Sequence, residues 1–121
     1  MVQLRNQATL REVDPLGKDS HEPGAKLDKG KLNLSRALRE FPLALHVVGM
    51  IGDYGAKKYS EGGWITVPDG QNRYGAAMLR HYVAEHREYM DLDMKLPHAG
   101  AVAWNALARL ELILKRGSRD E

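Results

Sequence analysis

The sequence predicts an all-α protein, a helical bundle of about three main helices with an irregular N-terminal arm. Apolar residues recur at spacings of three and four in three separate stretches, and few β-branched runs compete with them. The chain has 121 residues, of which 43% are hydrophobic and 28% charged, which fits one globular domain. We predict an arm at residues 1–23, a helical domain at 24–117 and a tail at 118–121.

Residues 1–33 are polar, with scattered glycine, proline, aspartate and lysine and no sustained period, which predicts irregular structure. Residues 24–35, GAKLDKGKLNLS, invite comparison with the phosphate-binding loop G-x-x-x-x-G-K-[ST]. Gly24 and Gly30 are one residue too far apart for that loop, and Leu32 stands where a hydroxyl would bind Mg²⁺. We interpret the stretch as an ordered arm that brings three charged residues to a site built elsewhere by helices. These residues are Lys26, Asp28 and Lys31.

The first helix is predicted over residues 41–59, with Pro42 at its first position, where the missing N–H costs nothing. Leu43, Val47, Met50 and Tyr54 follow at spacings of 4, 3 and 4 and form one apolar face. Residues 60–71 contain three glycines and a proline, which predicts a loop with a weak strand pattern at 64–67.

The second helix is predicted over about residues 73–91, with Asn72 as its cap. The third begins at Leu96–Pro97 and ends at Gly117, a residue type that favours helix termination. Its broad alanine and leucine face indicates close helix packing. Because three helices make a thin core, we expect a homo-oligomer, a dimer or tetramer, whose chains complete one bundle; a monomeric three-helix bundle is the alternative.

Composition narrows the function. The formal net charge is +2, so nucleic-acid binding is not demanded. The absence of cysteine excludes a disulfide scaffold, a thiolate zinc site and a cysteine nucleophile. The first residues have no apolar core of a signal peptide, and no apolar run is long enough to span a bilayer. We therefore expect a cytoplasmic protein, in the host cytoplasm if a phage encodes it.

Carboxylates cluster near the end of the predicted second helix. His81, Glu85, Glu88 and Asp91 follow at spacings of 4, 3 and 3, which places them along one side of a helix. Three carboxylates within two turns repel one another unless solvated or bound to a cation, and Mg²⁺ or Mn²⁺ prefers such oxygen ligands. Asp93 adds a fourth. The alternative is the solvated face of an amphipathic helix.

Other polar residues suit contacts to a ligand. His98 lies at a helix N-terminus, where the dipole disfavours its protonation, so it fits a neutral ligand, a base or a cap. Asn105, a mid-helix amide among alanines, fits a base edge or a hydrogen bond between helices. Trp64, in a glycine-rich loop, fits a base-stacking group or a loop anchor, and Lys58 can meet phosphates. No G-x-S-x-G or G-x-G-x-x-G motif is present.

Taken in order, several stretches resemble the phage-associated dATP/dGTP diphosphohydrolase family. They are Gly24–Lys31, Tyr54–Tyr59 with Trp64, Arg80–His81, Asp91 with Asp93, Leu96–His98, and Asn105. That family is similar in outline to the all-α, MazG-like nucleotide pyrophosphohydrolases, helical dimers or tetramers that bind divalent metal through acidic residues on paired helices. The resemblance implies hydrolysis of dATP or dGTP to the monophosphate and pyrophosphate. It also implies a place in phage nucleotide metabolism.

Glu85-x-x-Glu88 and Glu88-x-x-Asp91 resemble the metal-binding elements of the MazG-like enzymes. Those enzymes carry the two elements on different helices, whereas here they overlap on one. Glu40 or Asp53 on the first helix is therefore a candidate for the missing partner.

The hypothesis is a Mg²⁺- or Mn²⁺-dependent pyrophosphohydrolase with Glu85, Glu88, Asp91 and Asp93 as metal ligands. His81 or His98 would position the attacking water or move its proton. The expected phosphate contacts are Lys26, Lys31, Lys58 and Arg80, and the expected purine contacts are Trp64 and Asn105. Two alternatives stay open: a non-enzymatic helical module that binds phosphate or nucleic acid, and a phosphohydrolase of another helical class with His81, His98 and Asp91 as ligands.

Overall fold

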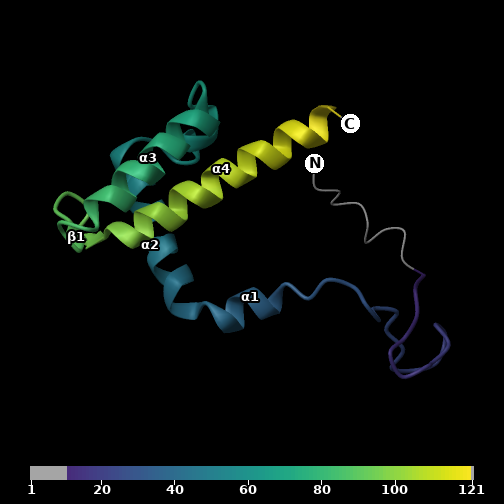
Figure 1. The fold of residues 1–121 in the computed structure, drawn as a ribbon. Helices are drawn as coiled ribbons and strands as arrows, with labels where there is room; N and C mark the ends of the chain where they lie inside the picture. Colours follow the sequence, from purple (N-terminus) through teal and green to yellow (C-terminus); the bar gives the residue numbers. More distant parts are fainter. Residues whose placement is uncertain (1–10, 121) are drawn as a thin grey trace. The chain divides into compact units, whose positions relative to one another are not determined.

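A computed structural model describes the chain over residues 11–120, with side chains as far as Gly117. The chain divides into two compact units, Met1–Arg39 and Glu40–Glu121. The helices are α1 (Ser35–Glu40), α2 (Pro42–Lys58), the 3₁₀ helix η2 (Gly63–Thr66), α3 (Gly70–Ala84) and α4 (His98–Asp120). Strands β1 (Met90–Asp91) and β2 (Leu96–Pro97) form one small sheet (Figure 1). The all-α prediction is confirmed.

The first unit is organised around the buried side chain of Asp14. Its carboxylate accepts the backbone N–H groups of Leu16 at 2.7 Å, Lys18 at 3.3 Å and Lys26 at 2.8 Å. The hydrogen bond from Lys26 is the largest cause that holds the pKa of Asp14 below its usual value. Gly24 and Gly30 have φ values of +84° and +76°, which other residues rarely adopt. Over residues 11–34 the arm therefore has an irregular but hydrogen-bonded structure; residues 1–10 lie outside the described part.

The second unit is held together by α4, which packs along α3 and crosses α2 (Figure 1). Gly100 lets α4 approach Val47 and Ile51 of α2, because a Cβ at residue 100 would lie 2.7 Å and 2.8 Å from their side chains. The buried apolar residues of the described chain are Ile51, Ala101 and Ala108, and no large side chain among the described residues is fully buried. The core is thin, as the sequence indicates.

The prediction of a second helix that continues to residue 91 is wrong, because α3 ends at Ala84. The backbone N–H groups of Arg87 and Glu88 both donate to the carbonyl of Ala84, at 2.9 Å, and the chain turns. The backbone N–H of His98 then donates to the carbonyl of Tyr89 at 3.0 Å, and β1 pairs antiparallel with β2. The hydrogen bonds of this short hairpin outweigh a helical propensity that no glycine or proline interrupts between Ala84 and Asp91.

Smaller boundaries also differ from the predictions. Asp69, with φ +54°, precedes α3 at the position expected for Asn72, and α4 begins after Pro97 and continues through Gly117. Residues 63–66 form η2 instead of a strand, and α1 is an additional helix. The helix that begins at Pro42 is confirmed, but its predicted apolar face is not the buried one, because Leu43 and Met50 are exposed and the buried residue is Ile51. In the described part of the chain, no helix combines the length and apolar character that crossing a bilayer requires.

Candidate functional site

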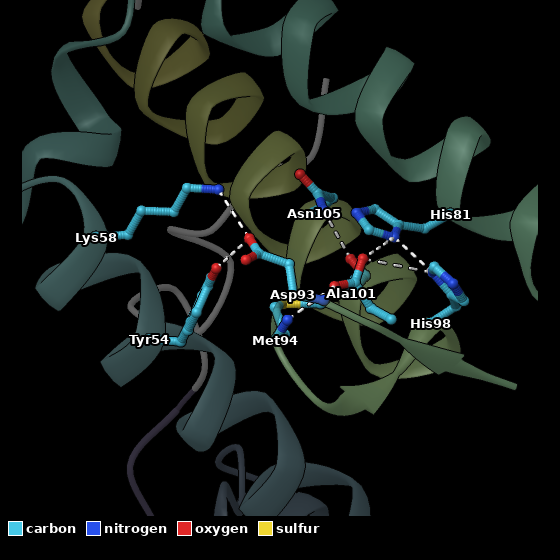
Figure 2. Close-up of polar contacts among 9 residues, drawn as sticks. Tyr54, Lys58, His81, Asp93, Met94, His98, Ala101 and Asn105 are labelled. Atoms are coloured by element: carbon cyan, nitrogen blue, oxygen red, sulfur yellow. Dashed lines mark hydrogen bonds and ion pairs between the residues drawn. The ribbon is translucent and has the colours of Figure 1, made fainter.

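Two histidines and one aspartate converge where α3, β1 and α4 meet. His81 lies in the last turn of α3, Asp91 ends β1, and His98 begins α4. The Nδ1 atoms of the two histidines are 2.9 Å apart, and Asp91 Oδ2 lies 3.9 Å from each of them. Figure 2 shows the imidazoles facing each other. One ligand atom from each residue lies within 4.8 Å of the others, which is the arrangement of a three-ligand metal site.

The two carboxylate oxygens of Asp91 have different surroundings. Oδ1 accepts the backbone N–H groups of Asp93 at 2.9 Å and Met94 at 2.8 Å, which fixes the side chain in the turn between β1 and β2. Oδ2 faces His81 and His98. Hydrogen bonds to one oxygen therefore orient the other towards the imidazoles, as in metal sites whose ligands are held by neighbouring groups.

Burial favours the neutral form of the His81 imidazole. Burial lowers the pKa of His81 below its ordinary value, and it outweighs the opposing charge of Asp91. His98 is only 6% exposed, and its Nε2 is buried without a hydrogen-bond partner among the described residues. The converging atoms are Nδ1 of each histidine and Oδ2 of Asp91, a donor set that fits a divalent ion. Imidazole ligands suit transition metals such as Zn²⁺ or Fe²⁺ better than Mg²⁺.

The other predicted metal ligands lie elsewhere. Because α3 ends at Ala84, Glu85 and Glu88 fall in the following turn and share no helix face with Asp91. Neither they nor Asp93, Glu40 and Asp53 belong to the convergent group found among the described residues.

Asp93 instead binds α2. Its Oδ2 accepts hydrogen bonds from the hydroxyl of Tyr54 and from Nζ of Lys58, the latter at 3.2 Å (Figure 2). The bond from Tyr54 is the largest cause that lowers the pKa of Asp93. Lys58, expected at the phosphates, is therefore an ion-pair partner of Asp93 that ties the β1–β2 turn to α2.

A shallow cavity of about 710 Å³, largely open to solvent, lies beside the cluster of His81, Asp91 and His98. Its walls comprise both histidines, Arg80 and Arg87, and alanine, leucine and valine side chains of α3. Arg80 was expected at the phosphates, whereas Arg87 is not among the predicted site residues. Its spacing of seven from Arg80 was the signal that could have found it.

Neither predicted purine contact lines this cavity. Trp64 packs edge-to-face against Tyr74 and Trp104, with ring centroids 6.2 Å and 5.9 Å away. Asn105 is buried, and its Nδ2 donates to the carbonyl of Ala101 at 2.8 Å within α4. Both side chains thus stabilise the helical unit.

The predicted arm residues Lys26, Asp28 and Lys31 belong to the first unit, where Lys31 pairs with Glu12 at 3.0 Å.

Comparison with known proteins adds one finding. The family model described as dATP/dGTP diphosphohydrolase, N-terminal, matches residues 21–121 and so covers most of the chain. No curated protein and no solved structure is significantly similar to the chain. The match confirms the family that the motifs indicate.

Proposed function

Since this chain belongs to the dATP/dGTP diphosphohydrolase N-terminal family, we propose that it hydrolyses deoxypurine triphosphates with the help of a divalent metal ion. The convergence of His81, Asp91 and His98 at the edge of a cavity carries the proposal. These three residues are the ligand set of the histidine-based alternative in the sequence analysis. They replace the overlapping carboxylate elements as the favoured metal site, because only they converge in the described part of the chain.

In the proposed reaction, water attacks the α-phosphorus, and the bond from the α-phosphorus to the bridging oxygen breaks. Deoxynucleoside monophosphate and pyrophosphate result, pyrophosphate keeps the bridging oxygen, and the proton of the attacking water passes to solvent. The metal, when bound, neutralises phosphate charge and lowers the pKa of a coordinated water. Arg80 stabilises negative charge on the phosphates from the cavity wall. Asp91, fixed by two backbone N–H groups, holds its free oxygen in place through the reaction.

The Nδ1 atoms of His81 and His98 lie within hydrogen-bond distance of each other, so a bound ion would take the place of the proton that they share. Because two of the three ligands are imidazoles, a transition metal should bind here more tightly than Mg²⁺.

The test is an assay with dATP and dGTP in which the released phosphate species is identified. We expect monophosphate and pyrophosphate, higher activity with Mn²⁺ than with Mg²⁺, and none in EDTA. His98→Asn should abolish turnover, whereas His46→Asn, which changes an exposed histidine of α2, should not. No turnover of any nucleotide with either metal, or full activity of His98→Asn, would contradict the proposal.

The arm and the assembly are further parts of this proposal. We expect Lys26→Ala and Lys31→Ala to reduce turnover without unfolding the protein, because both residues offer positive charge to a triphosphate. We also expect a homo-oligomer, which the thin core supports. Light scattering on the purified chain tests the assembly, and a monomer at micromolar concentration would contradict it. Phage nucleotide metabolism stays a prediction from the family resemblance.

A further inference from the structure

One face of α3 combines exposed apolar side chains with arginines. Ala76, Leu79, Arg80, Val83, Ala84 and Arg87 follow at spacings of 3, 1, 3, 1 and 3, which puts them on one side of the helix and its following turn. All six line the cavity beside the histidines. Leu79 is 59% exposed and Val83 62% exposed, values that are high for large apolar residues beside a candidate metal site. This wall is suited to an amphipathic ligand.

The charge on the wall is unpaired within the described part of the chain. The guanidinium groups of Arg80 and Arg87 form no ion pair or hydrogen bond there, although the backbone N–H of Arg87 donates to the carbonyl of Ala84. Arg80 lies in the last turns of α3, Arg87 lies in the turn that follows the helix, and both long side chains line the same cavity. Guanidinium groups bind phosphate oxygens with two parallel hydrogen bonds. The cavity therefore offers cations and an apolar surface to the same ligand.

We propose that this cavity is the nucleotide site, in which Leu79 and Val83 contact the purine and Arg87, together with Arg80, binds the triphosphate. The inference rests on the proposed function and places the substrate on α3. Trp64 and Asn105 are not needed for it, since Trp64 packs against two other aromatic rings and Asn105 donates within α4.

The wall also accounts for purine preference. Apart from the arginines and histidines, its lining consists of alanine, leucine and valine, which offer no hydrogen bond to a base edge. An apolar wall distinguishes bases by the area that they bury, so adenine and guanine bind alike and a pyrimidine binds more weakly.

Binding measurements on the full chain test this inference independently of turnover. The probes are the α,β-methylene analogues of dATP, dGTP and dCTP, which cannot be hydrolysed at the scissile position, and inorganic tripolyphosphate, each with Mn²⁺ and with EDTA. We expect Leu79→Ala and Val83→Ala to weaken analogue binding by about tenfold each and to leave tripolyphosphate binding unchanged. Arg87→Ala should weaken both probes by about 10- to 100-fold.

Matched controls lie outside the cavity. Leu107→Ala changes a half-exposed leucine of α4, and Arg116→Ala changes an exposed arginine of the same helix; both should bind every probe like the unmodified chain. Leu79→Met keeps apolar contact and should retain affinity. Thermal unfolding of each variant checks the fold.

Unchanged analogue binding in Leu79→Ala and Val83→Ala, or unchanged tripolyphosphate binding in Arg87→Ala, would overturn the inference. A roughly 100-fold difference between the adenine and guanine analogues would overturn the purine argument. If the unmodified chain binds the analogues through this wall but hydrolyses no nucleotide, the proposed function fails and the site stands.

Discussion

Replacing Asp91 by asparagine removes one negative charge from the group formed by His81, Asp91 and His98. It keeps the turn that this side chain organises. The amide oxygen of asparagine can still accept the N–H groups of Asp93 and Met94, because both donate to the same oxygen of Asp91. The amide nitrogen then replaces Oδ2, the atom that faces His81 and His98. The substitution therefore tests ligation with little change in backbone structure.

The magnitude follows from the attraction between the carboxylate of Asp91 and a bound cation, because neutral imidazoles carry no net charge. Two unit charges about 4 Å apart attract by about 1 kcal/mol in bulk water and about 4 kcal/mol at an effective dielectric of about 20. The larger value is the better guide here, since His98 is buried and Asp91 is half-buried. It corresponds to roughly a thousandfold in a binding constant, so we expect Asp91→Asn to weaken Mn²⁺ binding by at least about 100-fold.

The assay is calorimetric titration of the metal-free chain with Mn²⁺, followed by dATP turnover. Asp53→Asn, an exposed carboxylate of α2, is the matched control and should behave like the unmodified chain. Glu88→Gln distinguishes the two proposed ligand sets, because Glu88 belongs to the carboxylate set and not to the convergent group of His81, Asp91 and His98. If Glu88→Gln loses the metal and Asp91→Asn binds it normally, the overlapping carboxylates hold the ion and the reasoning from convergence is refuted.

Three further predictions concern stability. Gly100→Ala should lower the free energy of unfolding by about 1–3 kcal/mol, because the added methyl group would overlap Val47 and Ile51. Gly49→Ala should raise the free energy of unfolding by about 0.5–1 kcal/mol, because no atom of the described residues, apart from its chain neighbours and the backbone of its own helix, lies within 4 Å of its Cβ position. Thermal denaturation measures both changes, and equal effects would contradict the packing argument. Asp14→Ala should speed amide hydrogen exchange at Lys26, because the acceptor of that N–H group is lost. Asp28→Ala, which removes an exposed carboxylate of the same unit, is the control. Unchanged exchange at Lys26 in Asp14→Ala would show that Asp14 does not organise the arm. Because the pKa of His81 is lowered in the folded chain, the unfolded chain takes up this proton at a higher pH. The metal-free protein should therefore lose stability as pH falls below about 6.5, and His81→Gln should lose less. Urea titrations across that range measure the free energy of unfolding, and the same dependence on pH in both proteins would exclude the effect.

Local patterns were sufficient for the elements whose signals are local. The apolar spacing and Pro42 predict α2 because both act within a few residues of the helix that they specify. Candidate ligands could likewise be named by type, and His81, Asp91 and His98 appear as one of the open interpretations. The choice between these three residues and the carboxylates Glu85, Glu88 and Asp91 depended on whether the second helix continues past Ala84. No glycine or proline marks the end of the helix at Ala84.

By itself, the sequence determined the helical class, the family and the residues from which a metal site could be built. The tertiary structure decided which of them meet. The chain turns after Ala84 because Tyr89 bonds to His98 and β1 pairs with β2, and this turn carries Asp91 to the two histidines and leaves Glu85 and Glu88 outside the cluster. Helical periodicity predicts which side chains share a face of a helix, but it does not predict where the hydrogen bonds of a short hairpin end that helix.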